Sequence, residues 1–134
     1  MKTKEIKTAV FYGRVSTEEQ ARHGYGLDAQ QADCKKWAEL NGYQIVEYFI
    51  DAGKTGTNMD RQGMRNLLSY IKKHSVSTVI TWKLDRLSRN MKDFYGKIWT
   101  VLSDHNTTIA SYTERFDDIN EIDAVLIGVY IGQA

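Results

Sequence analysis

The sequence lacks proline, contains a single cysteine and has almost no net charge. The absence of proline argues against a proline-rich linker, and no repeat or low-complexity tract divides the 134 residues. Because Cys34 is the only cysteine, an internal disulfide framework and a cysteine-rich zinc site are excluded. The longest apolar run, residues 124–131, is far too short to span a membrane, and the N-terminal apolar run is too short for a signal peptide. We therefore expect a single soluble domain that resides in the cytoplasm.

Charge is small in total but unevenly distributed. The chain has 18 Lys and Arg against 17 Asp and Glu, and this balance of +1 argues against a strongly basic nucleic-acid-binding arm. Residues 1–103 hold 17 basic and 11 acidic residues, a net charge of +6, whereas residues 104–134 hold one basic and six acidic residues, a net charge of −5. The neutral total therefore consists of a basic body and an acidic end.

Strand and helix patterns alternate along the chain. Short apolar runs rich in β-branched and aromatic residues predict strands at residues 8–12, 44–50, 76–82 and 107–112. Apolar residues at helical spacing predict four helices, which carry Cys34, Trp37, Ala38 and Asn41; Met64, Leu67, Leu68 and Ile71; Met91, Phe94, Ile98, Val101 and Leu102; and Ala124, Ile127, Gly128 and Ile131. The first of these helices is expected to open with a capping box at Asp28 and Gln31. This order predicts an α/β fold, a mainly parallel β-sheet flanked by helices on both faces.

Polar residues follow the first three predicted strands. In folds of this kind ligands bind at the C-terminal ends of the strands, so these segments are expected to meet at one edge of the sheet. A hydroxyl nucleophile surrounded by arginines suits attack on a phosphate, because guanidinium groups bind phosphate oxygens and stabilise the charge that develops in the transition state. The residues concerned are the hydroxyl of Ser16, the carboxylates of Asp51 and Asp85, and the guanidinium groups of Arg14, Arg86 and Arg89.

Each of these residues also has a simpler interpretation. Ser16 begins an S-x-x-E pattern, so it could be only a helix N-cap. Arg86 and Arg89 could lie on a solvated basic face with Asp85 as a salt-bridge partner, and Asp51 could cap a turn.

Two alternative functions use the same residues. Asp51 and Asp85 could bind Mg²⁺ in a metal-dependent phosphatase or nuclease, although no further acidic cluster supports such a site and the nearby arginines would compete with a cation. A non-enzymatic, receiver-like α/β binding module would use Ser16 only as a cap. The Gly53-Lys54-Thr55 sequence is not a phosphate loop, because the motif requires a glycine at the position of Tyr48.

Four motifs, in this order and spacing, resemble the catalytic domain of serine site-specific recombinases, the resolvase/invertase family. They are Tyr12-Gly13-Arg14-Val15-Ser16, Leu27-Asp28-Ala29-Gln30, Asp60-Arg61-Gln62-Gly63 and Lys83-Leu84-Asp85-Arg86-Leu87-Ser88-Arg89. The resemblance extends from about Thr8 to the end of the chain. The extended segment at residues 21–27 is most similar to the N-terminal domain of large serine integrases and transposases.

The resemblance implies DNA strand cleavage and rejoining for site-specific recombination, as in the integration or excision of a mobile element. Ser16 matches the nucleophile that attacks a DNA phosphodiester, releases a 3′-OH and stays bonded to the 5′ phosphate. Arg14 matches an arginine at the scissile phosphate. The other matching residues are the arginine pair Arg86 and Arg89, the carboxylate Asp85 of the same segment, Gln30 of the L-D-x-Q motif, and the accessory site residues Asp51 and Arg61. The group that takes the proton from Ser16 stays open, since Asp85 could accept it or could only orient an arginine.

The resemblance also implies partners and limits. It implies no metal and no other cofactor, double-stranded DNA as the partner, a homodimer on each site and a homotetramer in the synapse, and a bacterial or mobile-element origin. Residues 1–134 are then expected to be the N-terminal catalytic domain, truncated within its C-terminal helix and without DNA-binding domains. Such a fragment is not expected to carry out recombination alone.

Overall fold

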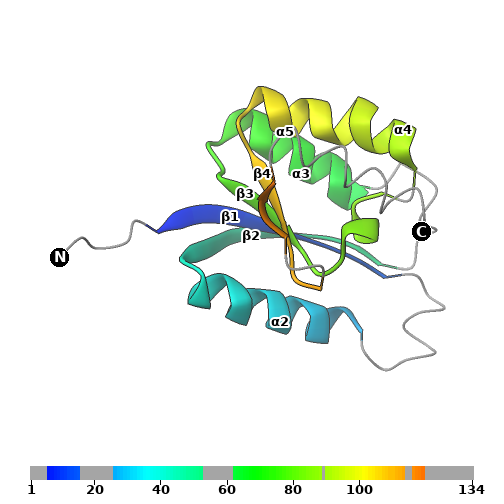
Figure 1. The fold of residues 1–134 in the computed structure, drawn as a ribbon. Coiled ribbons are helices and arrows are strands. Elements are labelled where there is room, and N and C mark those ends of the chain that lie inside the picture. Colours follow the sequence, from blue (N-terminus) through cyan, green and yellow to red (C-terminus); the bar gives the residue numbers. More distant parts are fainter. Residues whose placement is uncertain (1–5, 16–25, 53–61, 89, 114–115, 120–134) are drawn as a thin grey trace.

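A five-stranded sheet forms the centre of the computed structural model, which describes residues 6–15, 26–52, 62–88, 90–113 and 116–119 (Figure 1). The strand order is β2-β1-β3-β4-β5, with β1 to β4 parallel and β5 antiparallel to β4. The strands are β1 (Lys7–Val15), β2 (Tyr43–Ala52), β3 (Thr78–Thr81), β4 (Thr108–Ser111) and β5 (Phe116–Ile119). The four strands expected from the sequence are confirmed. The fifth was not predicted, because Asp117 and Asp118 at its centre hide the apolar pattern.

Helices cover both faces of the sheet, as the sequence predicted. Helix α2 lies on one face, while α3, α4 and α5 lie on the other (Figure 1). The helical elements are α2 (Leu27–Leu40), α3 (Gln62–Lys73), the 3₁₀ turn η1 (Leu84–Arg86), α4 (Met91–Asp93), the π-helical segment η2 (Phe94–Trp99) and α5 (Thr100–Asp104). The helix expected at residues 124–131 lies outside the described residues. No helix within the described ranges is long and apolar enough to cross a membrane.

The expected capping box at the start of α2 is wrong. The helix begins at Leu27, one residue before Asp28, and Gly26 occupies the N-cap position without a side-chain hydrogen bond. Asp28 instead lies in the first turn, where its negative charge interacts favourably with the helix dipole. A pattern of residue types therefore placed the helix correctly but misplaced its first turn.

Strand β1 is buried on both of its faces. Val10 and Tyr12 pack with α3, η2 and α5, whereas Ala9 and Phe11 pack on the α2 side of the sheet. The end of β1 lies close to the start of α2, because a Cβ atom on Gly13 would lie 2.8 Å from a methyl carbon of Leu27. The central position of β1 therefore brings its C-terminal end, which precedes Ser16, into the middle of the predicted active-site edge.

Candidate active site

The C-terminal ends of the parallel strands bring four of the predicted site residues together. Arg14 at the end of β1 pairs in register with Asp51 at the end of β2. Asp85 and Arg86 lie in η1, directly after β3. The predicted site residues Ser16, Arg61 and Arg89 lie outside the described residues, so their placement stays a prediction.

Arg14 links the end of β1 to the η1 turn. Its Nη2 donates a hydrogen bond to the main-chain carbonyl of Asp85 at 2.8 Å, and its Nε donates to the carbonyl of Arg86 at 3.2 Å. The side chain is fully buried, at 0% exposure. A buried charge must be compensated by strong hydrogen bonds, and the planar guanidinium can bind two carbonyls at once. Arg14 therefore connects two segments that lie 71 and 72 residues apart in the sequence.

Arg86 is buried rather than solvated. Only 7% of the residue is exposed, and its guanidinium carbon lies 5.8 Å from the ring centre of Trp82, within cation–π range. Its Nη1 lies 3.8 Å from Oδ1 of Asp85, an ion-pair distance that is too long for a hydrogen bond. The alternative in which Arg86 lies on a solvated face is therefore wrong. The hydrogen bond from Nη2 of Arg14 to Asp85 uses the main-chain carbonyl of Asp85, not its carboxylate.

Asp51 anchors the beginning of α3. Its Oδ1 accepts a hydrogen bond from the main-chain N–H of Gly63 at 2.8 Å, and its Oδ2 accepts from the N–H of Met64 at 3.0 Å and from the hydroxyl of Tyr12 at 2.7 Å. The carboxylate thus satisfies two of the main-chain donors that a helix N-terminus leaves without intrahelical partners. The local role of Asp51 is a cap, as the simpler interpretation suggested, although the capped element is a helix twelve residues later.

Three residues contribute to this edge without having been singled out from the sequence. The hydroxyl of Tyr12 donates a hydrogen bond to Asp51. The only indication of this role in the sequence is that a tyrosine in a buried strand needs a hydrogen-bond partner for its hydroxyl. The hydroxyl of Ser88 accepts from the N–H of Asn90 at 3.1 Å and donates to its carbonyl at 3.0 Å. The side chain of Asn90 in turn accepts from the N–H of Asp93 in α4. Serine and asparagine at such turns are recognisable, but only after the turn has been located.

Gln30 lies on the buried face of α2. Its side-chain oxygen Oε1 is buried, and no hydrogen-bond partner for it is found within the described part of the chain. The helix that carries Gln30 starts against the end of β1, as the close approach of Leu27 to Gly13 shows. The structure therefore places Gln30 on an element that borders the site, while its proposed role stays a prediction.

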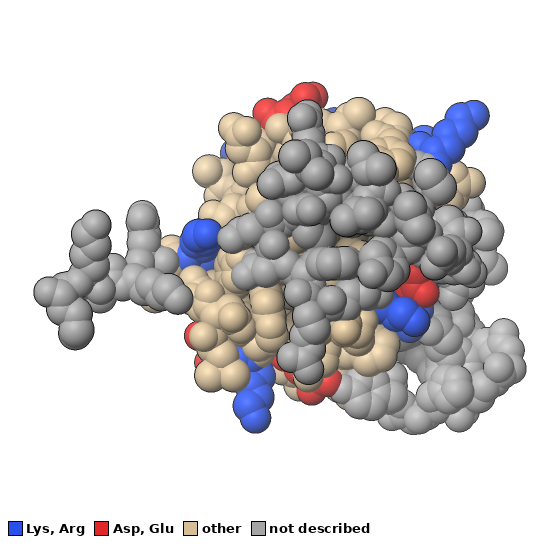
Figure 2. All heavy atoms as spheres, viewed as in Figure 1, with Lys and Arg blue, Asp and Glu red and all other residues tan. Residues whose placement is uncertain are grey.

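The described residues of the candidate site offer few ligands for a metal ion. Within the described residues, no group of three or more His, Cys, Asp or Glu side chains is arranged to hold a metal. Both oxygens of Asp51 already accept hydrogen bonds, and Asp85 lies beside the guanidinium of Arg86. Figure 2 also shows that the described Lys and Arg side chains on the visible face are separated from one another and form no continuous basic patch there.

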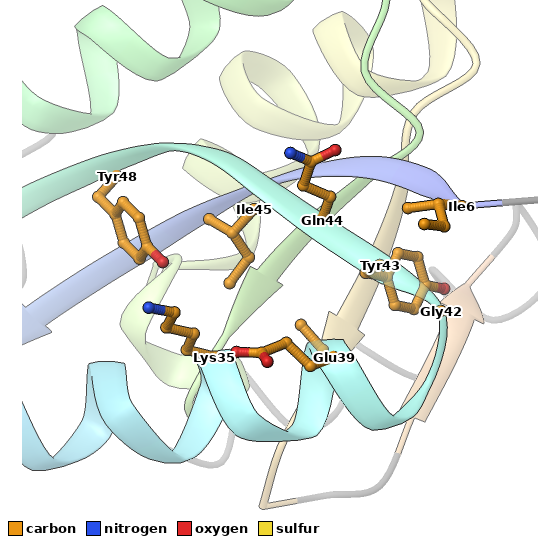
Figure 3. Close-up of a pocket in the computed structure, with 9 residues that line it drawn as sticks. Ile6, Lys35, Glu39, Gly42, Tyr43, Gln44, Ile45 and Tyr48 are labelled. Carbon is orange, nitrogen blue, oxygen red and sulfur yellow. The ribbon is translucent and has the colours of Figure 1, made fainter.

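Two further features lie apart from the candidate site. Burial raises the pKa of the Cys34 thiol to about 12, with a smaller contribution from the charge of Asp33, so this thiol is a poor nucleophile at neutral pH. A cavity of about 440 Å³ lies between α2 and β2, with Lys35, Tyr43 and Tyr48 among the residues that line it (Figure 3). None of the predicted site residues lines this cavity.

The sequence and the fold both match known proteins. Residues 9–134 match the family model described as the resolvase N-terminal domain. The chain belongs to this family. This match confirms the family resemblance that the four motifs carry. The parallel α/β fold is also the fold of its structural relatives.

Relatives of this resolvase domain include two solved structures and one curated protein. The crystal structure of the N-terminal catalytic domain of TP901-1 integrase has a TM-score of 0.76 and 29% identity, over 95% of this chain and 92% of that one. A resolvase family site-specific recombinase from Streptococcus pneumoniae has a TM-score of 0.73 and 28% identity, over 92% of this chain and 85% of that one. A protein of Bacillus subtilis (strain 168) named "Putative DNA recombinase" is 39% identical over 80 residues, which cover 60% of this chain and 15% of that protein. The resolvase domain therefore has the sequence and fold of a serine recombinase catalytic domain.

Proposed function

We propose that this domain cleaves and rejoins DNA strands through Ser16. In cleavage, the hydroxyl oxygen of Ser16 forms a bond to the scissile phosphorus, the bond from phosphorus to the 3′ oxygen breaks, and the proton lost by the serine ends on that 3′ oxygen. The products are a free 3′-OH and a 5′-phosphoserine. Attack by a 3′-OH on the phosphoserine reverses these steps, so rejoining needs no external energy source.

One observation carries the proposal. The strand that leads directly to Ser16 is hydrogen-bonded to the turn that carries Arg86, through the contacts of Arg14 with main-chain carbonyls. The segment of the proposed nucleophile and the segment of a proposed phosphate-binding arginine are thereby joined at one edge of the sheet. Arginines at such a position stabilise the negative charge of the transition state, and a single one is worth about 10³–10⁵ in rate in other phosphoryl-transfer enzymes.

The resemblance further supports double-stranded DNA as the substrate, with Arg89 beside Arg86 at the phosphate and Arg61 and Gln30 as accessory residues. It also supports a homodimer on each site and a homotetramer in the synapse. Most affinity for DNA normally comes from many phosphate contacts. The resemblance implies that, in this family, DNA-binding domains other than the catalytic domain supply that affinity.

The nucleophile is tested by trapping the covalent intermediate. The full-length protein is mixed with target DNA, denatured, digested and analysed by peptide mass, which is expected to locate the DNA adduct on Ser16. Ser16→Ala is expected to abolish the adduct. Thr107→Val serves as a control, because it removes a buried hydroxyl that bonds to Val76 at the opposite end of the sheet. An adduct that persists in Ser16→Ala contradicts the proposal.

The two alternative functions predict different results. A metal-dependent phosphatase or nuclease that uses Asp51 and Asp85 would lose its activity in the presence of EDTA and regain it with Mg²⁺, whereas the serine mechanism is expected to be unaffected by the chelator. A receiver-like binding module would show no change in any DNA reaction when Ser16 is replaced by alanine.

A further inference from the structure

Trp82 lies between the end of β3 and the η1 turn that carries Arg86. Its main-chain carbonyl accepts a hydrogen bond from the N–H of Thr113 at 2.9 Å, so the link between the segments of β3 and β4 continues past the ends of both strands. The indole ring is partly buried against the core cluster on the α2 side of the sheet, which contains Phe11 and Ile80. The sheet and the core behind it therefore set the position of the ring.

The main chain of Arg86 is held in place as well. Its N–H donates to the carbonyl of Lys83 at 3.0 Å, and its carbonyl accepts from Nε of Arg14 at 3.2 Å. These bonds fix the start of the Arg86 side chain but not the direction of its long, rotatable stem. The ion pair with Asp85 restrains the guanidinium only weakly, because its 3.8 Å separation is too long for a hydrogen bond.

The ring of Trp82 contacts the guanidinium directly. The guanidinium carbon of Arg86 lies over the ring, 5.8 Å from its centre. Tryptophan is the strongest cation–π partner among the aromatic side chains, and the attraction grows when the cation is desolvated, as it is in Arg86 with 7% exposure. Arginine stacks on aromatic faces, and such a contact requires no N–H donor, so the donors stay available for phosphate oxygens. A carboxylate or carbonyl in the same place would compete with the phosphate for them.

We propose that Trp82 is a positioning residue, which holds the guanidinium of Arg86 through the face of its ring and orients it for the scissile phosphate. The catalytic consequence rests on the proposed function, which takes Arg86 as a phosphate-binding arginine. A cation–π contact of ordinary strength corresponds to a factor of about 2 to 30 in an equilibrium constant. Its loss should lower the fraction of molecules with an oriented Arg86, and with it the rate of cleavage, by up to that factor.

Fluorinated tryptophans test the contact with little change in the size of the ring. Fluorine withdraws electron density from the ring face, so each added fluorine weakens its attraction for a cation. Monofluoro-, difluoro- and tetrafluorotryptophan are introduced at position 82 of the full-length protein, and the Ser16–DNA adduct is followed in a single turnover. The rate is expected to fall stepwise along the series, by about 2- to 30-fold in total. A rate that does not depend on fluorine content would overturn the proposal.

The same substitution at Trp37 is the matched control. This ring packs against the same core cluster as Trp82, but it stacks on Tyr43, with ring centres 5.8 Å apart and an interplanar angle of 17°. Tetrafluorotryptophan at position 37 therefore changes a ring beside a neutral partner, and the rate of adduct formation is expected to stay unchanged. An equal fall at positions 37 and 82 would assign the effect to the core and refute the role of Trp82.

Two natural substitutions separate the ring face from the indole N–H. Trp82→Phe keeps an aromatic face and removes the N–H, whereas Trp82→Leu removes both. Because the proposed contact uses the face, Trp82→Phe is expected to form the adduct faster than Trp82→Leu. Equal rates in these two variants would show that the aromatic face is not the feature that matters.

NMR measures the contact without DNA. The order parameter of the Arg86 Nε–H bond, which reports the mobility of the guanidinium, is expected to fall in Trp82→Leu and in the tetrafluoro variant at position 82, and to stay unchanged in the variant at position 37. An unchanged order parameter in both Trp82 variants would contradict the contact. If the order parameter falls as expected but the natural protein forms no adduct on Ser16, the proposed function fails and the contact stands, so the two failures are distinguishable.

Discussion

Replacing Gly63 with alanine is expected to destabilise the protein at the junction between β2 and α3. A Cβ atom at this position would lie 2.6 Å from the carbonyl oxygen of Ile50 and 2.8 Å from Oδ2 of Asp51. Neither neighbour can move easily, because the first is backbone and the second belongs to a carboxylate that accepts three hydrogen bonds. The added methyl group must therefore separate the start of α3 from the Asp51 carboxylate.

The size of the effect follows from two costs and one gain. Overpacking a buried site costs about 1–3 kcal/mol. Weakening a hydrogen bond to the charged Asp51 adds about 1.5–3 kcal/mol if the bond is lost completely. Alanine in a helix gains at most about 1 kcal/mol over glycine. We therefore expect Gly63→Ala to lower the free energy of unfolding by about 2–4 kcal/mol.

Urea denaturation provides the measurement. With a slope of about 2 kcal/mol per molar urea, in the middle of the usual range, the midpoint for Gly63→Ala should fall by about 1–2 M. Gly96→Ala is the matched control, since Gly96 is exposed in the π-helical segment and a Cβ atom there would meet nothing within 4 Å. That control should be unchanged or more stable by up to about 1 kcal/mol. A Gly63→Ala midpoint equal to or above that of Gly96→Ala would refute the steric argument.

Three further predictions concern single polar groups. Tyr12→Phe should lower the free energy of unfolding by about 1–2 kcal/mol in urea denaturation, because it removes a buried donor to Asp51; no loss would show that the bond is not stabilising. Thr107→Val should lower it by about 1 kcal/mol and leave the yield of the DNA adduct unchanged, since its bond to Val76 lies away from the site; a lower yield would disprove this separation. The pKa of Cys34 is raised from 9.0 to about 12, so the folded state keeps its thiol proton where the unfolded state has lost it, and stability should fall as pH rises from 9.0 towards 12. Cys34→Ala should make this alkaline decline shallower, and an unchanged decline would assign it to other groups.

The strands and helices of the fold were predictable where local chemistry decides them. β-Branched and aromatic runs located the four parallel strands, and the apolar stripe with Met64, Leu67 and Ile71 located α3, whose three residues are buried as expected. The fifth strand escaped because its pairing with β4 depends on a neighbouring strand and not on its own residues. The first turn of α2 was misplaced because Gly26 and Asp28 are both acceptable N-caps by residue type, and only the path of the chain selects between them.

The composition of the candidate site was also predictable, since motif order identified the residues at the ends of β1, β2 and β3. The contacts that hold their side chains were not. The sequence left open whether Arg86 lies in solvent, and it gave no sign of what holds Arg14. The structure buries both and places the Arg14 donors on carbonyls more than 70 residues away. Every residue has a main-chain carbonyl, so no sequence motif could predict which carbonyls Arg14 binds.

The sequence by itself determined the order of the four parallel strands and of the helices between them, the recombinase family and the identity of the candidate site residues, because these depend on residue type and spacing along the chain. Only the tertiary structure decided that Asp51 caps α3 while binding Tyr12, and that Arg14 joins β1 to the η1 turn. These hydrogen bonds connect residues 12 to 72 positions apart. They exist only after the parallel strands have aligned their C-terminal ends, and that alignment results from the packing of the whole sheet against its two layers of helices.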